Sequence, residues 1–161
     1  GVIIAVFIYS KKEQLNLLWL LDKIAIASAL FGFFVRSGNF INSEIVGIET
    51  KVSWAVVFER LDNLPRHPAQ LYEAVCYLAI FVVLMVLYNK TKIKEYYGAL
   101  LGVLLCTVFS ARFIIEFVKE KQAAYSTDIA LSTGQMLSIP FFIVGVILIV
   151  AAMRKTNTKT I

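Results

Sequence analysis

Two charged residues in an otherwise apolar stretch are the side chains of this sequence most suited to chemistry. Arg112 and Glu116 lie four positions apart in the segment SARFIIEFV, so a helix places them one turn apart on the same face. A charge near the middle of a membrane helix costs about 2.5–3.5 kcal/mol, so a retained one is expected to face protein, water or substrate. Either the two side chains neutralise each other, or they hold an anionic ligand. We favour the ligand, because arginine before glutamate is the weaker order for a helical ion pair.

A second candidate region runs from Arg36 to Gly47. An arginine at a helix end often only anchors the helix at the membrane surface. Here, amide side chains, a carboxylate and two glycines follow within twelve residues, including Asn39 and Glu44. This composition suits a turn that wraps a polar ligand. Together with Arg112, it indicates a phosphate-bearing lipid as the ligand and leaves the reaction open.

The segment after this region contributes further polar side chains. Gln70, Glu73 and Tyr77 fall on one face of a helix at steps of three and four residues. They either belong to the same site or form a polar helix start that faces the preceding loop. Residues 52–58 of that loop, VSWAVVF, are rich in strand formers and predict a short strand or an interfacial segment.

Histidine and cysteine usage limits the other kinds of chemistry. His67 is the only histidine, so a histidine metal cluster is excluded within this sequence, and we expect neither a metal nor a cofactor. A single loop histidine before proline is more often structural than catalytic. Cys76 and Cys106 lie inside apolar runs without metal-binding spacing, so we interpret them as packing residues.

The composition defines the elements that must position these residues. Of the 161 residues, 59% are hydrophobic and 17% charged, against about 45–50% apolar and about 25% charged in soluble domains. Both a soluble domain and intrinsic disorder are therefore excluded. A hydrocarbon core about 30 Å thick takes about 20 helical residues per crossing, so four or five crossings would use most of the chain.

Apolar runs between clusters of charge predict four complete membrane helices, near residues 17–35, 71–88, 97–118 and 137–153. Residues 1–9 are apolar but too short to span a bilayer, so we expect them to be the end of a fifth helix that begins upstream. The predicted fold class is all-α. It is a polytopic membrane protein with a long extracytoplasmic loop, formed by one integral-membrane domain over residues 1–161 that is truncated at its N-terminus.

The basic residues predict the orientation of these helices. The net charge is +5, but the 16 basic residues are spread between apolar runs, which favours membrane orientation over nucleic-acid binding, so we expect no nucleic acid as a partner. Lysine and arginine are densest around residues 11–12, 90–94 and 154–159. By the positive-inside rule these segments and the C-terminus are cytoplasmic, whereas the long loops 36–70 and 119–135 face outward.

Local signals predict details at two helix ends. Ser132 and Gln135 fit a capping box at the start of the last helix. Asp22 and Lys23 are adjacent near the cytoplasmic end of the first complete helix, where we expect them to pair with each other or the lysine to extend to the membrane surface.

At these residues the sequence resembles the prolipoprotein diacylglyceryl transferase family, bacterial enzymes that attach diacylglycerol to lipoprotein precursors. The resemblance extends to about Met153 and follows the order of the family's motifs. The matching segments are residues 36–47 (RSGNFINSEIVG), 54–58 (WAVVF), 66–73 (RHPAQLYE), 112–116 (RFIIE) and 134–140 (GQMLSIP).

The resemblance implies a reaction in the bacterial cytoplasmic (inner) membrane, with the active site toward the extracytoplasmic face. The diacylglyceryl group of phosphatidylglycerol moves to the lipobox cysteine of a prolipoprotein signal peptide, which is the first step of lipoprotein maturation. A thioether forms and glycerol phosphate leaves. An arginine that binds the departing phosphate stabilises the transition state more than the ground state.

The resemblance also implies roles for individual residues. It makes Arg112, Glu116 and Glu73 catalytic, and it assigns phosphatidylglycerol binding to Arg36, Asn39, Glu44 and Gly47. The family's candidate base is a histidine in a His-Gly-Gly segment that we expect before Gly1, with Glu44, Glu73 or Glu116 as orienting groups or alternative bases. Residues 1–161 alone are therefore expected to be inactive.

Two other functions are compatible with the polar residues alone. A transporter or lipid-moving protein would use Arg112 and Glu116 to line a path, and Pro140 within the last predicted helix fits the broken helices of such proteins. A non-catalytic membrane subunit would use the same polar residues only to hold helices together.

Overall fold

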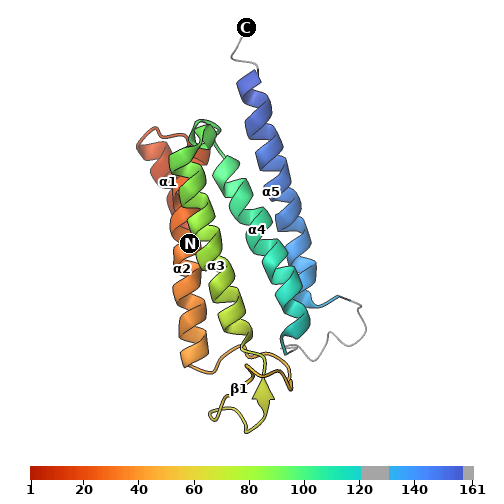
Figure 1. The fold of residues 1–161 in the computed structure, drawn as a ribbon. Helices are drawn as coiled ribbons and strands as arrows, with labels where there is room; N and C mark the ends of the chain where they lie inside the picture. Colours follow the sequence, from red (N-terminus) through yellow and green to blue (C-terminus); the bar gives the residue numbers. More distant parts are fainter. Residues whose placement is uncertain (121–130, 158–161) are drawn as a thin grey trace.

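A computed structural model of the chain describes residues 1–120 and 131–157. Figure 1 shows a bundle of long helices with a small irregular layer at one end. The α-helices are α1 (Val2–Lys12), α2 (Leu17–Ile41), α3 (Ala69–Lys90), α4 (Ala99–Ile115) and α5 (Thr133–Asn157). The short elements are the 3-10 helices η1 (Lys92–Glu95) and η2 (Glu116–Val118) and the strands β1 (Val56–Val57) and β2 (Pro65–Arg66).

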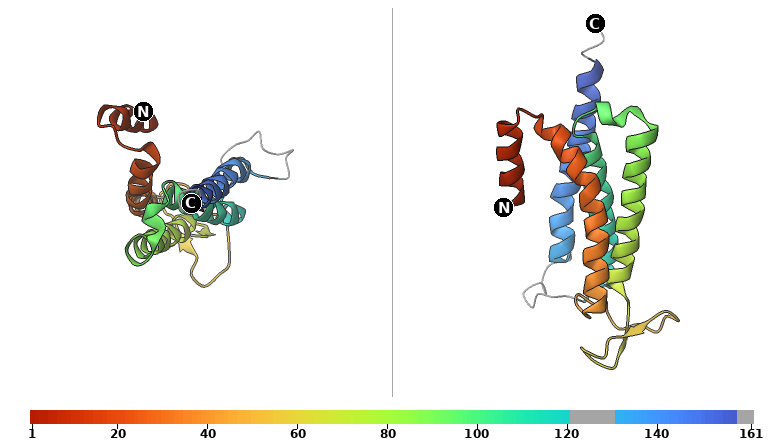
Figure 2. Two further views of the ribbon diagram at one scale, coloured as in Figure 1. Left: turned by 90° about the horizontal axis from the view of Figure 1, so that it is seen from above. Right: turned by 90° about the vertical axis from the view of Figure 1, so that its left-hand side faces the viewer.

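The chain runs up and down through α2, α3, α4 and α5. Within the described residues, four helical segments are long and apolar enough to cross a membrane. They correspond to α2, α3, α4 together with η2, and α5. The predicted all-α, polytopic class is confirmed. The apolar stretch at residues 1–9 forms part of α1, which lies beside α2 at the edge of the bundle (Figure 2).

Helix α2 is longer than predicted. The sequence predicts that it ends near residue 35 and that a turn begins at Arg36, but the helix continues to Ile41. Its last turns are closed by backbone bonds such as the Asn42 amide to the Gly38 carbonyl, at 3.0 Å. The turn begins after them, where Ser43 and Ile45 have positive φ angles of 60° and 54°. The prediction was wrong because amides and glycine near a helix end are also compatible with helical geometry.

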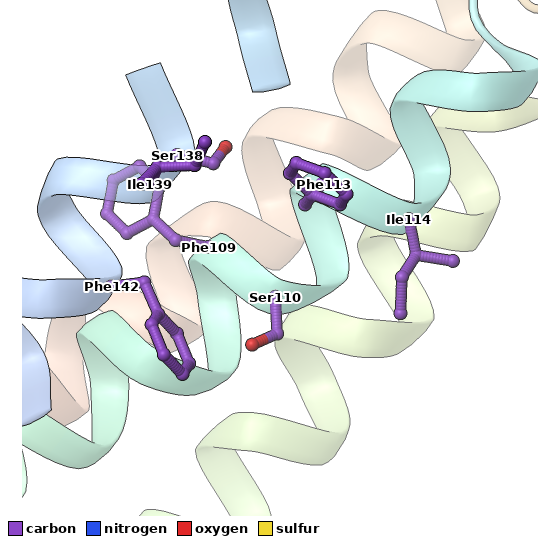
Figure 3. A pocket seen from close by; sticks show the side chains of 7 residues that line it. All are labelled: Phe109, Ser110, Phe113, Ile114, Ser138, Ile139 and Phe142. Atoms are coloured by element: carbon purple, nitrogen blue, oxygen red, sulfur yellow. The ribbon is translucent and has the colours of Figure 1, made fainter. Parts of the chain in front are cut away.

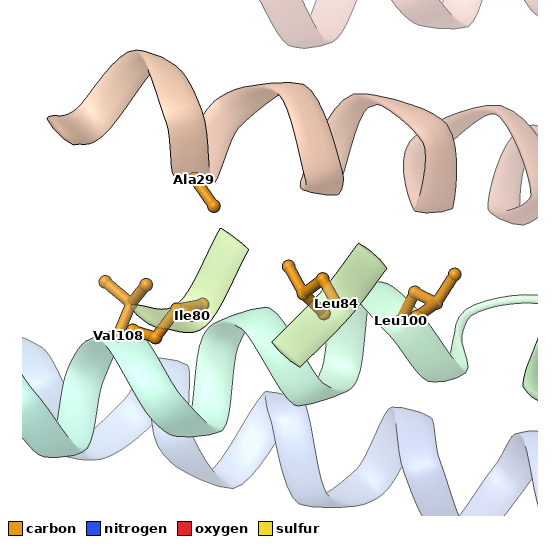
Figure 4. Packing of buried hydrophobic residues seen from close by; sticks show 5 residues of the cluster. All are labelled: Ala29, Ile80, Leu84, Leu100 and Val108. Atoms are coloured by element: carbon orange, nitrogen blue, oxygen red, sulfur yellow. The ribbon is translucent and has the colours of Figure 1, made fainter. Parts of the chain in front are cut away.

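Small residues let the helices approach closely. A Cβ atom at Gly102 of α4 would lie 2.7 Å from the Gly145 carbonyl oxygen of α5, and one at Gly32 of α2 would lie 2.6 Å from the Tyr77 ring of α3. Such close contacts favour helix association in lipid, where the hydrophobic effect between helices is weak. The buried cluster between α2, α3 and α4 (Figure 4) consists of Ala29, Ile80, Leu84, Leu100 and Val108.

Of the two predicted helix-end features, the structure contains the capping box but not the pairing of Asp22 with Lys23. The capping box is confirmed: the Gln135 amide donates to Ser132 Oγ at 3.2 Å, and the Ser132 amide donates to Gln135 Oε1 at 3.0 Å. The pairing of Asp22 with Lys23 is wrong. Lys23 Nζ instead donates to the Tyr88 hydroxyl at 2.8 Å and lies 4.0 Å from the centre of that ring.

Asp22 caps a different helix from its own. It is only 3% exposed, and its two carboxylate oxygens accept the backbone amides of Gly98 at 2.7 Å and Leu101 at 2.8 Å. These amides belong to the start of α4, where the helix dipole also favours a negative charge. Asp22 therefore joins α2 to α4 at the end of the bundle that contains η1.

Replacing Asp22 with alanine should destabilise the bundle. The Asp22→Ala variant leaves two buried amides without acceptors, which should lower the free energy of unfolding by roughly 1–3 kcal/mol. Asp22→Asn retains one acceptor oxygen and should lose less. Thermal melting in detergent, followed by circular dichroism, measures the order of the three proteins. An alanine variant that melts with the parent would contradict this capping role.

Candidate functional site

The segment between α2 and α3 forms the small layer below the helices in Figure 1. Strands β1 and β2 pair antiparallel, with Val56 opposite Arg66, so the short-strand alternative for residues 52–58 is correct. Isolated bridges add Glu49 to Arg66 and Gly47 to Lys119. The second bridge fixes the backbone that follows α4 against the loop that follows α2.

Gly47 lies where two backbone segments pass very close to it. A Cβ atom there would lie 2.5 Å from the His67 carbonyl oxygen and 2.7 Å from the Val118 carbonyl oxygen. Its own amide donates to the same His67 oxygen at 3.0 Å. The glycine is therefore required for packing of this layer, whereas its predicted contact with a lipid stays a prediction.

Arg66 holds the loop together through its charge. Its guanidinium donates to Asp62 Oδ2 at 2.6 Å and to the Gly47 carbonyl at 3.3 Å, and lies 3.2 Å from Glu120 Oε2. The hydrogen bonds from Arg66 lower the pKa of the Asp62 carboxyl, and the same carboxyl raises the pKa of Arg66. Both groups therefore stay charged near neutral pH.

His67 connects this layer to the start of α3. Its Nδ1 is 3.1 Å from the Tyr72 hydroxyl, which also accepts the indole N–H of Trp54 at 2.8 Å. Because an indole N–H can only donate, the Tyr72 hydroxyl has its own proton available for His67. These contacts are consistent with the structural role expected for the single histidine.

A charge cluster lies where α2, α3 and the end of α4 meet; we define it as Arg36, Glu73, Glu116 and Lys119. Glu73 is 2% exposed, and its Oε2 lies 3.1 Å from Arg36 Nε. Its Oε1 accepts from Lys119 Nζ at 3.4 Å, and the same lysine lies 3.6 Å from Glu116 Oε2. The Arg36 contact is an ion pair without hydrogen-bond alignment, because Glu73 Oε2 has no hydrogen-bond partner among the described residues.

Glu116 is positioned by the start of α5. Its Oε1 accepts from Ser132 Oγ at 3.0 Å. A Cβ atom at Gly134 would lie 2.6 Å from Glu116 Oε2, so any larger residue there requires the carboxylate to move. The capping residue and the glycine that follows it therefore fix the second carboxylate of the charge cluster.

Arg112 does not pair with Glu116. Among residues 1–120 and 131–157, no ion pair within 4.0 Å involves Arg112, so the self-neutralising alternative is wrong. Arg112 instead lines a narrow gap between α3 and α4 that is also lined by Glu73 and Tyr77. Counted with the charge cluster, three cations accompany two carboxylates, which leaves one positive charge in excess.

Two apolar cavities share Phe109 in their lining, and the first of them reaches Arg36. The first, of about 310 Å³, lies between α2, α3 and α4 and is lined by Arg36, Tyr77 and apolar side chains such as Phe31 and Leu105. The second, of about 330 Å³, lies between α4 and α5 (Figure 3). Its lining residues are Phe109, Ser110, Phe113, Ile114, Ser138, Ile139 and Phe142.

The structure brings together some predicted residues and separates others. Arg36, Glu73 and Glu116 meet in the charge cluster, and Arg112 borders it. Asn39 and Glu44 lie beyond it: Asn39 Nδ2 donates to Glu44 Oε2 at 3.4 Å, and the Glu44 side chain is exposed.

Gln70 belongs to the buried side of α3, as the helical spacing predicts. It is fully buried and donates from Nε2 to the Glu44 carbonyl at 2.6 Å. This bond connects the start of α3 to the turn that follows α2. The alternative of a polar helix start that simply faces the loop is therefore wrong for Gln70 and Glu73, both of which are buried.

Sequence reasoning missed three contributors. The sequence predicts Lys119 only as the first residue of the long loop 119–135, although its position three residues after Glu116 places it within reach of that carboxylate. Ser132 and Gly134 carry no signal of contact with Glu116, because that contact depends on how α5 packs. Within the described parts of the chain, no group of three His, Cys, Asp or Glu side chains is arranged to hold a metal ion.

Comparisons with known proteins are consistent across nearly the whole chain. A family model described as prolipoprotein diacylglyceryl transferase matches residues 1–151. A relative from Tolumonas auensis, named phosphatidylglycerol–prolipoprotein diacylglyceryl transferase, is 50% identical over 156 residues, which cover 96% of this chain and 60% of the relative.

Two more curated relatives carry the same name. The protein from Chloroherpeton thalassium is 48% identical over 160 residues, covering 99% of this chain and 60% of its own length. That from Bacteroides fragilis is 43% identical over 159 residues, covering 99% of this chain and 57% of its own length. The chain thus spans about three fifths of the length of these relatives.

Proposed function

Because the chain belongs to the prolipoprotein diacylglyceryl transferase family, we propose that the protein transfers the diacylglyceryl group of phosphatidylglycerol to the lipobox cysteine of prolipoproteins. The relatives' names supply the lipid and the protein substrate. The observation in this chain that carries the proposal is the charge cluster, which together with Arg112 has one cation more than it has carboxylates. A phosphodiester with one negative charge complements that excess.

The apolar cavity beside Arg36 supports a lipid as the bound phosphate ester. Its volume of about 310 Å³ is in the range of ligand pockets, and Arg36 lies on its wall. A lipid with its phosphate at Arg36 can place part of an acyl chain among Phe31, Leu105 and their neighbours. The same arrangement allows Arg112 to approach the phosphate from α4.

The proposed reaction is an alkylation of sulfur. The cysteine thiol of the substrate loses its proton, its sulfur forms a bond to a glycerol carbon of the lipid, and the bond from that carbon to the phosphate oxygen breaks. The electron pair stays with the departing glycerol phosphate. Arg36 and Arg112 stabilise the negative charge that grows on this leaving group.

In this proposal the two carboxylates position Arg36 and Lys119. Both oxygens of Glu73 are engaged by cations, Oε2 by Arg36 and Oε1 by Lys119. Glu116 is held by Lys119 and by the hydroxyl of Ser132. We therefore assign Glu73 and Glu116 to positioning the cations, and leave the proton of the thiol to another group.

Bacterial relatives and four apolar helices fit a multi-pass bacterial membrane protein. We place it in the cytoplasmic (inner) membrane, with the charge cluster toward the extracytoplasmic face and the C-terminus in the cytoplasm. The distribution of lysines between the two ends of the bundle supports this orientation. A transporter or a non-catalytic subunit would have no need for Arg36 beside an apolar cavity together with Arg112 beside Glu73.

The orientation is tested by cysteine labelling. Asn63 lies in the loop between β1 and β2, and in a variant without Cys76 and Cys106 a cysteine at Asn63 should react with a membrane-impermeant maleimide in intact spheroplasts. A cysteine at Lys90, at the opposite end of the bundle, is the matched control and should react only after lysis. The reverse pattern would overturn the orientation.

The reaction is tested with arginine variants of the protein expressed from its own gene. Arg36→Ala and Arg112→Ala should each lower the transfer rate by roughly 100-fold to 1,000-fold, which is about 2.7–4 kcal/mol, if each loses a contact comparable to an oxyanion-hole donor. Lysine at either position should restore little activity, because it lacks the planar fork of donors. The measurement is the mass of a reporter lipoprotein, which gains one diacylglyceryl group. Absence of this product from well-inserted parent protein would favour the transporter or subunit.

Gly134→Ala should reduce the same activity without removing any charged group. The added methyl group must displace the Glu116 carboxylate, which disturbs Lys119 and the charge cluster. Gly38→Ala is the matched control, because a Cβ atom at Gly38 meets nothing within 4 Å. We expect a clear loss of rate at Gly134 and little change at Gly38. Equal transfer rates for the two variants would show that the reaction does not depend on the position of the Glu116 carboxylate.

A further inference from the structure

The largest of the cavities described here lies at the opposite end of the bundle from the charge cluster. It has a volume of about 570 Å³ and lies where η1, the start of α4 and the end of α5 meet, near the top of Figure 1. Its lining residues include Lys92, Tyr96, Val103, Ile149, Met153 and Arg154. The transferase reaction proposed above makes no use of it.

The lining changes from apolar to cationic along the helix axis. Val103 and Ile149 form the part that lies within the spanning segments of α4 and α5, whereas Lys92 lies in η1 and Arg154 at the end of the last span. Arg154 lies five positions after Ile149, which corresponds to about 7.5 Å of helical rise. A cavity of this kind matches a molecule with an apolar tail and an anionic head.

The charges around the cavity favour an anionic head group. Lys90 and Lys94 flank Lys92 at the end of α3 and in η1. The acidic side chain of η1 is Glu95, and the nearby Asp22 carboxylate is occupied by the amides of Gly98 and Leu101. Basic pockets between membrane helices near the cytoplasmic surface are the places where anionic head groups bind.

We propose that this cavity binds an anionic phospholipid of the adjoining leaflet, with its phosphate against Lys92 and Arg154 and an acyl chain along Val103 and Ile149. In the orientation proposed above, this is the cytoplasmic leaflet. The site is separate from the charge cluster and does not depend on the transfer reaction. A purely polar ligand such as free phosphate would leave the apolar wall without a partner.

Photo-crosslinking with two lipids tests the proposal. The protein, expressed from its own gene, is placed in nanodiscs that contain either phosphatidylglycerol or phosphatidylcholine, each with the same diazirine-bearing acyl chain. After irradiation, labelled residues are mapped by mass spectrometry. We expect phosphatidylglycerol to label residues 149–153 several-fold more than phosphatidylcholine, since each nearby cation contributes about fivefold in affinity for an anionic lipid.

Variants connect the preference to the cavity. Lys92→Gln combined with Arg154→Gln should reduce labelling by phosphatidylglycerol to the level of phosphatidylcholine, whereas Lys90→Gln, outside the cavity lining, should retain the preference. Equal labelling by both lipids in the parent protein would overturn the proposal without reference to any variant. So would a preference that survives the double substitution, or the absence of label from residues 149–153, which would show that another protein segment covers the cavity.

Discussion

The buried carboxylate of Glu73 constrains the whole end of the bundle at which the charge cluster lies. An ionised group that is 2% exposed needs positive partners, because its loss of hydration costs several kcal/mol. Arg36 of α2 supplies one at 3.1 Å and Lys119, just after η2, supplies the other at 3.4 Å. The bridge between Gly47 and Lys119 fixes the lysine from the loop side. The ends of α2, α3 and α4 are therefore fixed relative to one another by one side chain.

The opposite end of the bundle stabilises a buried carboxylate in a different way. Asp22 accepts two backbone amides at the start of α4 and so needs no cation. At the first end, cations accompany the carboxylates and exceed them by one once Arg112 is included. That difference supports the proposal that the reaction, which develops negative charge, takes place at the first end. At the second end, the helix cap leaves the surrounding lysines to interact with other anions.

Much of the fold follows from the sequence, because length and hydrophobicity alone determine how many helices can cross a bilayer. The capping box also follows, since its bonds are local to Ser132 and Gln135. The end of α2 does not, because the residues after Arg36 suit both a turn and a helix. Partners in the charge cluster depend on packing between helices, so spacing along α4 wrongly offered Glu116 as the partner of Arg112. The contact of Lys119 with Glu73 was missed for the same reason, whereas its contact with Glu116 is local.

In the proposed reaction, the guanidinium groups of Arg36 and Arg112 bind the phosphate of the substrate lipid. The most direct measurement is an experimental structure of the protein, expressed from its own gene, with phosphatidylglycerol bound. We expect the phosphate in contact with both arginines, with Glu73 still between Arg36 and Lys119 and an acyl chain in the cavity lined by Phe31 and Leu105. A phosphate bound elsewhere, with both guanidinium groups turned away from it, would rule out this role for the arginines.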